Sequence, residues 1–176
     1  MDVFVATARQ FKDEALPLYF LGLAADTTQM DLDEAQALAE AFSKRHPDQS
    51  WPLYFLGHRA YLAARTSGSE EGFNHARELL SRSITLRGDD PDAHLDLGSV
   101  DAHFNSWREA AHEYQEAIRL NPDLAEAHFR LSQAYSELGD SARASVEMET
   151  HKRLQAQQTE QEMSQRVGVF VYKLSH

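Results

Sequence analysis

Residues 91–122 read PDAHLDLGSVDAHFNSWREAAHEYQEAIRLNP, and this stretch decides the fold. Apolar side chains recur in it three or four positions apart, at Ala93, Leu97 and Val100 in the first half and at Ala110, Tyr114, Ala117 and Ile118 in the second. This spacing places them on one face of an α-helix. The stretch therefore predicts two amphipathic helices joined by a short turn, which is a helical hairpin.

Similar units occur on both sides of this hairpin. The hexapeptide Pro-Leu-Tyr-Phe-Leu-Gly stands at residues 17–22 and again at residues 52–57. Leu97-Gly98 and Leu131-Ser132 continue the series 34 residues apart. A helix-breaking residue lies nine positions before the Leu of three units, at Pro47, Gly88 and Pro122. A fixed period of this length indicates an array of hairpins that bury their apolar faces against one another.

These units resemble tetratricopeptide repeats (TPRs), hairpins of about 34 residues that stack into an α-solenoid. The family has Leu-Gly on the first helix, Ala and an aromatic residue on the second, and a closing Pro. The unit from residue 91 matches these positions with Leu97, Gly98, Ala110, Tyr114 and Pro122. The resemblance implies an all-α fold, an α-solenoid of antiparallel helix hairpins wound as a TPR-like right-handed superhelix, with a long C-terminal helix.

The resemblance also divides the chain into three parts. Residues 1–13 are expected to form an N-terminal segment, and residues 14–155 a TPR-like array. Its hairpins are expected at about residues 14–47, 49–88, 91–122 and 125–155. Residues 156–176 are expected to form a C-terminal helix extension and an apolar tail.

We expect two sets of residues, three glycines and two histidines, to lie where helices pack together. Gly22, Gly57 and Gly98 stand in the middle of predicted helices, where glycine costs roughly 1 kcal/mol relative to alanine. We therefore expect a Cβ at these positions to clash with the partner helix. His94 and His128 occupy equivalent positions in consecutive units, so we expect both to pack between helices.

The sequence pattern changes after residue 141. Residues from Ser141 to about Arg166 predict one long helix rich in Gln, Glu, Arg and Lys. Residues 167–174 are β-branched and aromatic, and such a segment is prone to aggregate when it is exposed. We expect this tail to dock on its own solenoid, on a second copy of the chain, or on further sequence.

Composition and motifs argue against several classes of function. The 17 Lys and Arg against 28 Asp and Glu give a net charge of −11, which disfavours binding to nucleic acid. The chain has no cysteine for disulfides or thiolate chemistry. It also has no glycine-rich phosphate loop and no His-Glu-x-x-His motif, and no two histidines stand three or four apart. We therefore expect no enzyme, no cofactor and no metal.

The sequence also bears on the cellular compartment. No run approaches the roughly 18 apolar residues that span a membrane, and residues 1–5 do not resemble a signal peptide. These observations favour the cytoplasm, although the compartment stays unknown.

In the TPR family, peptide ligands lie on the concave face that is lined by the first helix of each repeat. The N-terminal half of this face is aromatic in the present chain. The peptide-binding residues implied by the resemblance are Tyr19, Leu23, Trp51, Tyr54, His58, Tyr61, Leu95 and Phe129. Large aromatic side chains suit this role because they supply contact area at low entropic cost. The alternative interpretation is that some of them pack between helices or against residues 3–11.

Three functional hypotheses follow. The first is a non-enzymatic interaction module that binds a peptide or protein segment on its concave face. The second is a structural protein that homo-oligomerises, for instance as a homodimer, through residues 167–174. The third is an enzyme or small-molecule sensor, which would need a closed polar pocket.

Overall fold

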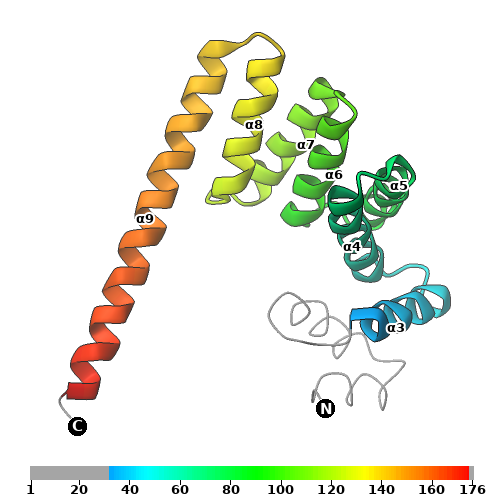
Figure 1. Ribbon diagram of the computed structural model, residues 1–176, viewed down its shortest axis with the longest axis horizontal. Coiled ribbons are helices and arrows are strands. Elements are labelled where there is room, and N and C mark those ends of the chain that lie inside the picture. The colour runs from blue at the N-terminus through cyan, green and yellow to red at the C-terminus, as the bar shows by residue number, and fades with distance from the viewer. Residues whose placement is uncertain (1–31, 175–176) are drawn as a thin grey trace. The chain divides into compact units, whose positions relative to one another are not determined.

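The computed structural model of the chain describes residues 32–174, with side chains described for residue 33 and residues 35–163. Within this range the chain forms seven helices and no strand, as Figure 1 shows. The helices are α3 (Leu32–Arg45), α4 (Trp51–Ser67), α5 (Glu70–Leu86), α6 (Pro91–His103), α7 (Trp107–Leu120), α8 (Ala125–Glu137) and α9 (Ser141–Leu174). The predicted all-α fold is thus confirmed.

The chain divides into two compact units, of which the first ends at Val100 and the second begins at Asp101. In unit 1, α4 and α5 pack together as a hairpin, and α3 lies against α4. In unit 2, α8 packs against both α7 and α9. Each unit therefore buries its apolar residues between neighbouring helices, as stacked hairpins require.

The hairpin of α4 and α5 depends on a close approach at Gly57. A Cβ added there would lie 2.9 Å from Leu80 Cγ and 3.2 Å from Leu79 Cβ. The expectation that this glycine makes room for the partner helix is confirmed. The turn itself uses Gly68, whose φ of 70° suits glycine, and the hydroxyl of Ser69, which accepts a hydrogen bond from the Gly72 amide.

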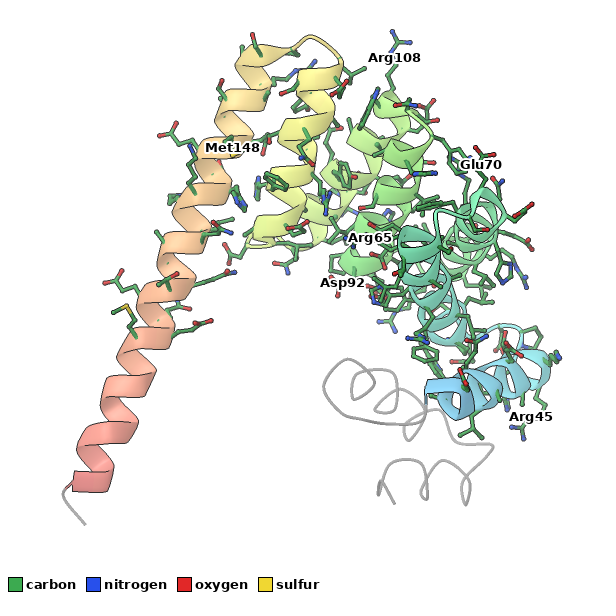
Figure 2. The ribbon with its side chains drawn as sticks, in the orientation of Figure 1. Arg45, Arg65, Glu70, Asp92, Arg108 and Met148 are labelled. Carbon is green, nitrogen blue, oxygen red and sulfur yellow. The ribbon has the colours of Figure 1, made fainter. Side chains whose placement is uncertain are left out.

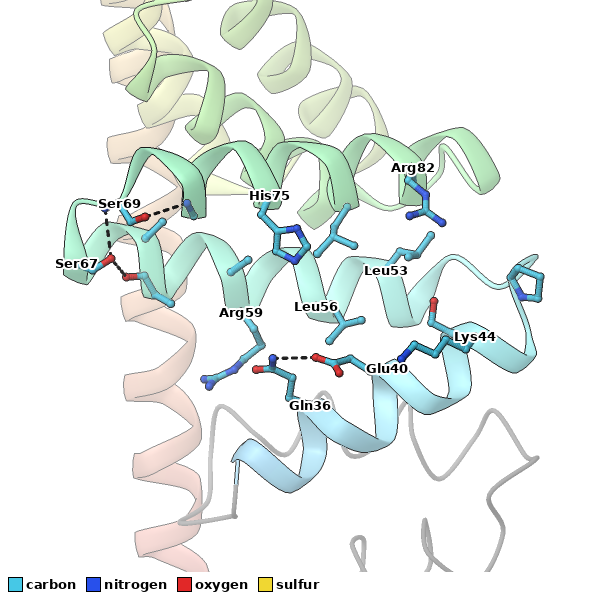
Figure 3. Close-up of a pocket in the computed structure, with 17 residues that line it drawn as sticks. Gln36, Glu40, Lys44, Leu53, Leu56, Arg59, Ser67, Ser69, His75 and Arg82 are labelled. Atoms are coloured by element: carbon cyan, nitrogen blue, oxygen red, sulfur yellow. Dashed lines mark hydrogen bonds between the residues drawn. The ribbon is translucent and has the colours of Figure 1, made fainter.

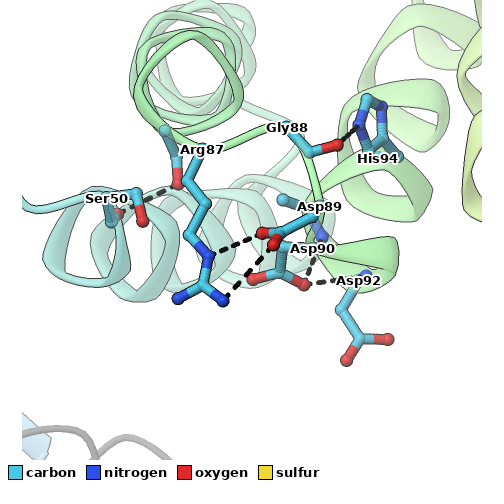
Figure 4. A network of polar contacts seen from close by, with 9 residues as sticks. Ser50, Arg87, Gly88, Asp89, Asp90, Asp92 and His94 are labelled. Atoms are coloured by element: carbon cyan, nitrogen blue, oxygen red, sulfur yellow. Dashed lines mark hydrogen bonds and ion pairs between the residues drawn. The ribbon is translucent and has the colours of Figure 1, made fainter. Parts of the chain in front are cut away.

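The loop between α5 and α6 is held by carboxylates, as Figure 4 shows. Asp90 Oδ1 accepts hydrogen bonds from the amides of Asp92 and Ala93 at 3.0 and 3.4 Å, and so caps the start of α6. Arg87 Nε donates to Asp89 Oδ1 at 2.6 Å. This hydrogen bond is the main reason why the pKa of Asp89 lies below its usual value.

His94 and His128 each contact a backbone carbonyl oxygen six residues earlier, in the loop before their own helix. His94 Nε2 lies 3.4 Å from the carbonyl oxygen of Gly88, and His128 Nε2 lies 3.1 Å from that of Pro122. Both imidazoles are buried. Because a carbonyl oxygen only accepts, Nε2 carries the hydrogen in each ring. The predicted equivalence of these two histidines is confirmed.

The C-terminal helix differs from its predicted length. The sequence predicted a helix that ends at about Arg166, but α9 continues to Leu174. The apolar residues 167–174 therefore extend the helix, because each added residue contributes one more backbone hydrogen bond once a helix has formed. Leu154 is buried, whereas every side chain from residue 155 to residue 163 is exposed.

None of the helices in the described part of the chain is long and apolar enough to cross a lipid bilayer.

Candidate peptide-binding surface

The structure describes six of the eight predicted peptide-binding residues, and their surroundings differ. Tyr19 and Leu23 lie outside the described residues. Helix α4 carries Trp51, Tyr54, His58 and Tyr61, helix α6 carries Leu95, and helix α8 carries Phe129. The first five of these belong to unit 1, and Phe129 belongs to unit 2.

Two of the aromatic residues on α4 pack between helices. The ring of Trp51 lies 5.1 Å from that of Phe42 on α3, at the edge of an apolar cluster with Ala35 and Ala39. Tyr61 is 7% exposed, and its ring meets that of Phe73 on α5 edge-on at 6.3 Å. Both side chains therefore contact a neighbouring helix, as the packing interpretation expects, and Trp51 is partly exposed.

Tyr54 and His58 lie one turn apart on α4 and are both half-buried. Their ring centroids are 5.9 Å apart. His58 Nδ1 lies 2.6 Å from Asp96 Oδ2 on α6, so the pair joins the two helices. Since a carboxylate only accepts, Nδ1 donates its hydrogen to Asp96. The arrangement fixes the imidazole beside the tyrosine.

Sequence reasoning missed Asp96, which is 8% exposed. Its carboxylate stands between Leu95 and Leu97 in the sequence, and a charge buried among apolar residues needs a partner. The partner, His58, is 38 residues earlier in the chain, and no local pattern connects the two. Only the packing of α4 on α6 brings them together.

The electrostatic character of this surface comes from the first turns of α6. Partial desolvation raises the pKa of Asp92 although its side chain is exposed, the negative charges of Asp90 and Asp96 raise the pKa further, and His58 acts in the opposite direction. Asp92 is labelled on the first turn of α6 in Figure 2. The charges of Asp90 and Asp96 thus act on Asp92 in the same direction, while His58, which is hydrogen-bonded to Asp96, opposes them.

Unit 2 carries a separate aromatic surface on α8 and α9. Phe129 is half-buried, and its ring lies 5.1 Å from that of His151. His151 Nδ1 lies 2.8 Å from the carbonyl oxygen of Ala125, which fixes the imidazole against the start of α8. Nearby on the same helices, His128 Nδ1 lies 2.6 Å from Glu147 Oε2. Sequence reasoning missed Glu147 and His151 as well.

Within the described residues, no group of three His, Asp or Glu side chains is placed to hold a metal ion.

Comparison with known proteins identifies the repeat. Residues 105–139 match the family profile described as the TPR repeat, which confirms the resemblance for this part of the chain. A comparison with curated proteins found no match.

Solved structures of MamA share the fold. One crystal structure of MamA is 18% identical, with a TM-score of 0.68 over 89% of this chain and 87% of that one. A second is 18% identical, with a TM-score of 0.65 over 89% and 81%. A double mutant of MamA is 19% identical, with a TM-score of 0.67 over 88% and 83%. At this identity the likeness shows the fold, a TPR-like helical solenoid.

Proposed function

We propose that this chain is a non-enzymatic adaptor that binds a peptide segment on the surface formed by Tyr54, His58, Leu95 and the carboxylates of α6. The TPR repeat and the solenoid fold support a protein–protein interaction module in general, because stacked hairpins present extended surfaces to partner proteins. The observation that carries the specific surface is the half-exposed Tyr54 ring beside the His58–Asp96 pair.

The chemistry of this surface favours a partner that is both basic and apolar. Tyr54 offers a rigid ring for apolar or aromatic side chains. Asp92, Asp90 and Asp96 provide negative charge that a Lys or Arg of the ligand would neutralise. The net charge of −11 acts in the same direction and disfavours nucleic acid as the ligand.

The experiment is a binding assay with a panel of labelled ten-residue peptides that combine one aromatic residue with zero, one or three lysines. We expect affinity to increase with the number of lysines. The variants Tyr54→Ala and Asp92→Asn should each weaken binding about tenfold, because each removes one of the two features of the surface.

Arg65→Gln is the matched control, since it changes one charge at an exposed position of the same helix. Melting temperatures of all variants would show that they fold. Affinity that is independent of lysine content, or equally reduced in all three variants, would exclude this surface as the binding site.

Self-assembly is the second candidate function, and one observation favours it. The nine residues 155–163 of α9 have no buried side chain, although the helix continues to Leu174. Most of the stability of a helix in a protein comes from packing of one face, so a second copy packed along α9 would stabilise this segment. Light scattering on the full chain and on a version that ends at Arg166 tests this idea. A dimer in either version supports assembly, its loss on truncation would assign the contact to residues 167–174, and two monomers exclude assembly.

A further inference from the structure

A groove lies between α3, α4 and α5, on a different face of α4 from Tyr54 and His58. Figure 3 shows this groove, which has a volume of about 750 Å³. Side chains from all three helices line it, and its apolar part consists of Leu53, Leu56, Ala60, Ala63, Ala64 and Leu79. The members of this set that belong to α4 lie between Leu53 and Ala64 and recur every three or four residues, so they form one stripe along that helix.

The dimensions of the groove suit a polypeptide. Its lining follows α4 from Leu53 to Ser67. At 1.5 Å per residue, this stripe is about 21 Å long. A metabolite would fill only part of that length, whereas an amphipathic helix of about 14 residues would match it.

The charges at the groove are unusual for so acidic a chain. Three cationic residues, Lys44, Arg59 and Arg82, line it together with a single acid, Glu40. Arg82 already pairs with Glu78 at 3.7 Å, and Glu40 accepts a hydrogen bond from Gln36 at 3.0 Å.

Arg59 provides the sharpest indication of a ligand. Figure 3 shows its side chain extending from α4 toward Gln36 on α3. Its Nε atom is buried and has no hydrogen-bond partner among the described residues. A buried guanidinium N–H without an acceptor is unfavourable, and a carboxylate can satisfy it with two parallel hydrogen bonds. The groove thus presents an apolar floor beside an unsatisfied cationic donor.

We propose that this groove binds an acidic amphipathic segment of a partner protein, with apolar side chains on the floor and carboxylates at Arg59 and Lys44. This second surface is independent of the peptide-binding surface around Tyr54. The two surfaces lie on different faces of α4 and select opposite charges.

The test uses a synthetic 14-residue peptide with leucine at positions 1, 4, 5, 8, 11 and 12 and glutamate elsewhere, and a second peptide with lysine in place of glutamate. Fluorescence anisotropy with the full chain measures both affinities. We expect the glutamate peptide to bind and the lysine peptide not to bind in this groove. Arg59→Gln should weaken binding of the glutamate peptide at least tenfold, and Lys44→Gln several-fold.

Two controls keep the result interpretable. Arg65→Gln removes the same charge from an exposed position of α4 outside the groove and should leave the affinity unchanged. Tyr54→Ala should also leave it unchanged, which separates this proposal from the proposed function. Circular dichroism melts establish that each variant folds.

Several results would overturn the proposal. Glutamate-peptide affinity that Arg59→Gln leaves unchanged, or equal losses of that affinity in Arg59→Gln and Arg65→Gln, would show that the groove is not the binding site. A wild-type dimer that Arg59→Gln converts to a monomer in light scattering would assign the groove to a second copy of the chain instead.

Discussion

Asp140 holds the start of α9 through both of its carboxylate oxygens. Oδ1 accepts a hydrogen bond from the Arg143 amide at 3.0 Å, and Oδ2 accepts one from Arg143 Nε at 2.6 Å. The backbone hydrogen bond, followed by the side-chain bond, lowers the pKa of Asp140 below its ordinary value of 3.8. The ion pair also raises the pKa of Arg143.

Because the pKa of Asp140 is lower in the folded than in the unfolded chain, its contribution to stability is present above pH 3.8 and is lost as the pH falls through the folded value. Asp140→Asn keeps an acceptor for the cap but removes the ion pair. We expect this variant to melt at a lower temperature than wild type at pH 7, with a difference that shrinks below pH 4. Thermal melts between pH 7 and pH 3 measure this, and a difference that grows toward pH 3 would contradict it.

His128 is a second residue whose contacts lead to a prediction. Its two ring nitrogens face the carbonyl oxygen of Pro122 and the carboxylate of Glu147. His128→Leu would leave both acceptors without their donor, at a cost of about 1–3 kcal/mol in the free energy of unfolding. Urea denaturation measures this loss. His112→Leu, at an exposed position of α7, is the control and should change stability by less than about 0.5 kcal/mol.

At the scale of the helical elements, Gly57 shows how packing outweighs helix propensity. Gly57→Ala would gain roughly 1 kcal/mol from propensity alone. However, the new Cβ would lie 2.9 Å from Leu80 Cγ, and Leu80 is fully buried. Overpacking costs typically about 1–3 kcal/mol, so we expect a net loss of stability in urea denaturation.

Gly88→Ala is the matched control for this prediction. A Cβ at Gly88 would meet only the carbonyl oxygen of Ile84, at 3.4 Å. The substitution should therefore be close to neutral. If Gly57→Ala were as stable as Gly88→Ala, the close approach of α4 and α5 would not limit the hairpin.

The elements differ in how far the sequence could predict them. Helices α6 and α7 follow from apolar spacing within residues 91–122, because the spacing that makes a helix amphipathic is local. The end of α9 did not follow, since the β-branched residues 167–174 suggested a separate tail. The pairing of His58 with Asp96 could not be predicted either, because it depends on two helices 38 residues apart.

The same limit applies to the candidate surfaces. The family pattern placed Tyr54 and His58 on a face with Trp51 and Tyr61, but the structure packs the latter two against Phe42 and Phe73. Sequence periodicity identifies which residues share a face of a helix. It does not identify which parts of that face a neighbouring helix covers.

At the scale of the whole molecule, net charge and local charge oppose each other at one surface and agree at the other. The chain carries a net charge of −11, whereas the groove beside Arg59 is locally basic and the surface beside Asp92 is acidic. Added salt screens the distant charges of the whole molecule more than the charges close to each surface. The Debye length is about 30 Å at 0.01 M salt and about 8 Å at 0.15 M.

This difference predicts opposite salt dependences for the association rates of the two peptide classes. A lysine-rich peptide that approaches Tyr54 is attracted by the whole molecule, so its association rate should fall as salt is added. A glutamate-rich peptide that approaches Arg59 is repelled at long range and attracted only near the groove, so moderate salt should accelerate its association. Stopped-flow measurements at 0.01 M and 0.15 M salt distinguish the two responses. If salt slowed both peptides equally, the groove beside Arg59 would not be the binding site of the acidic one.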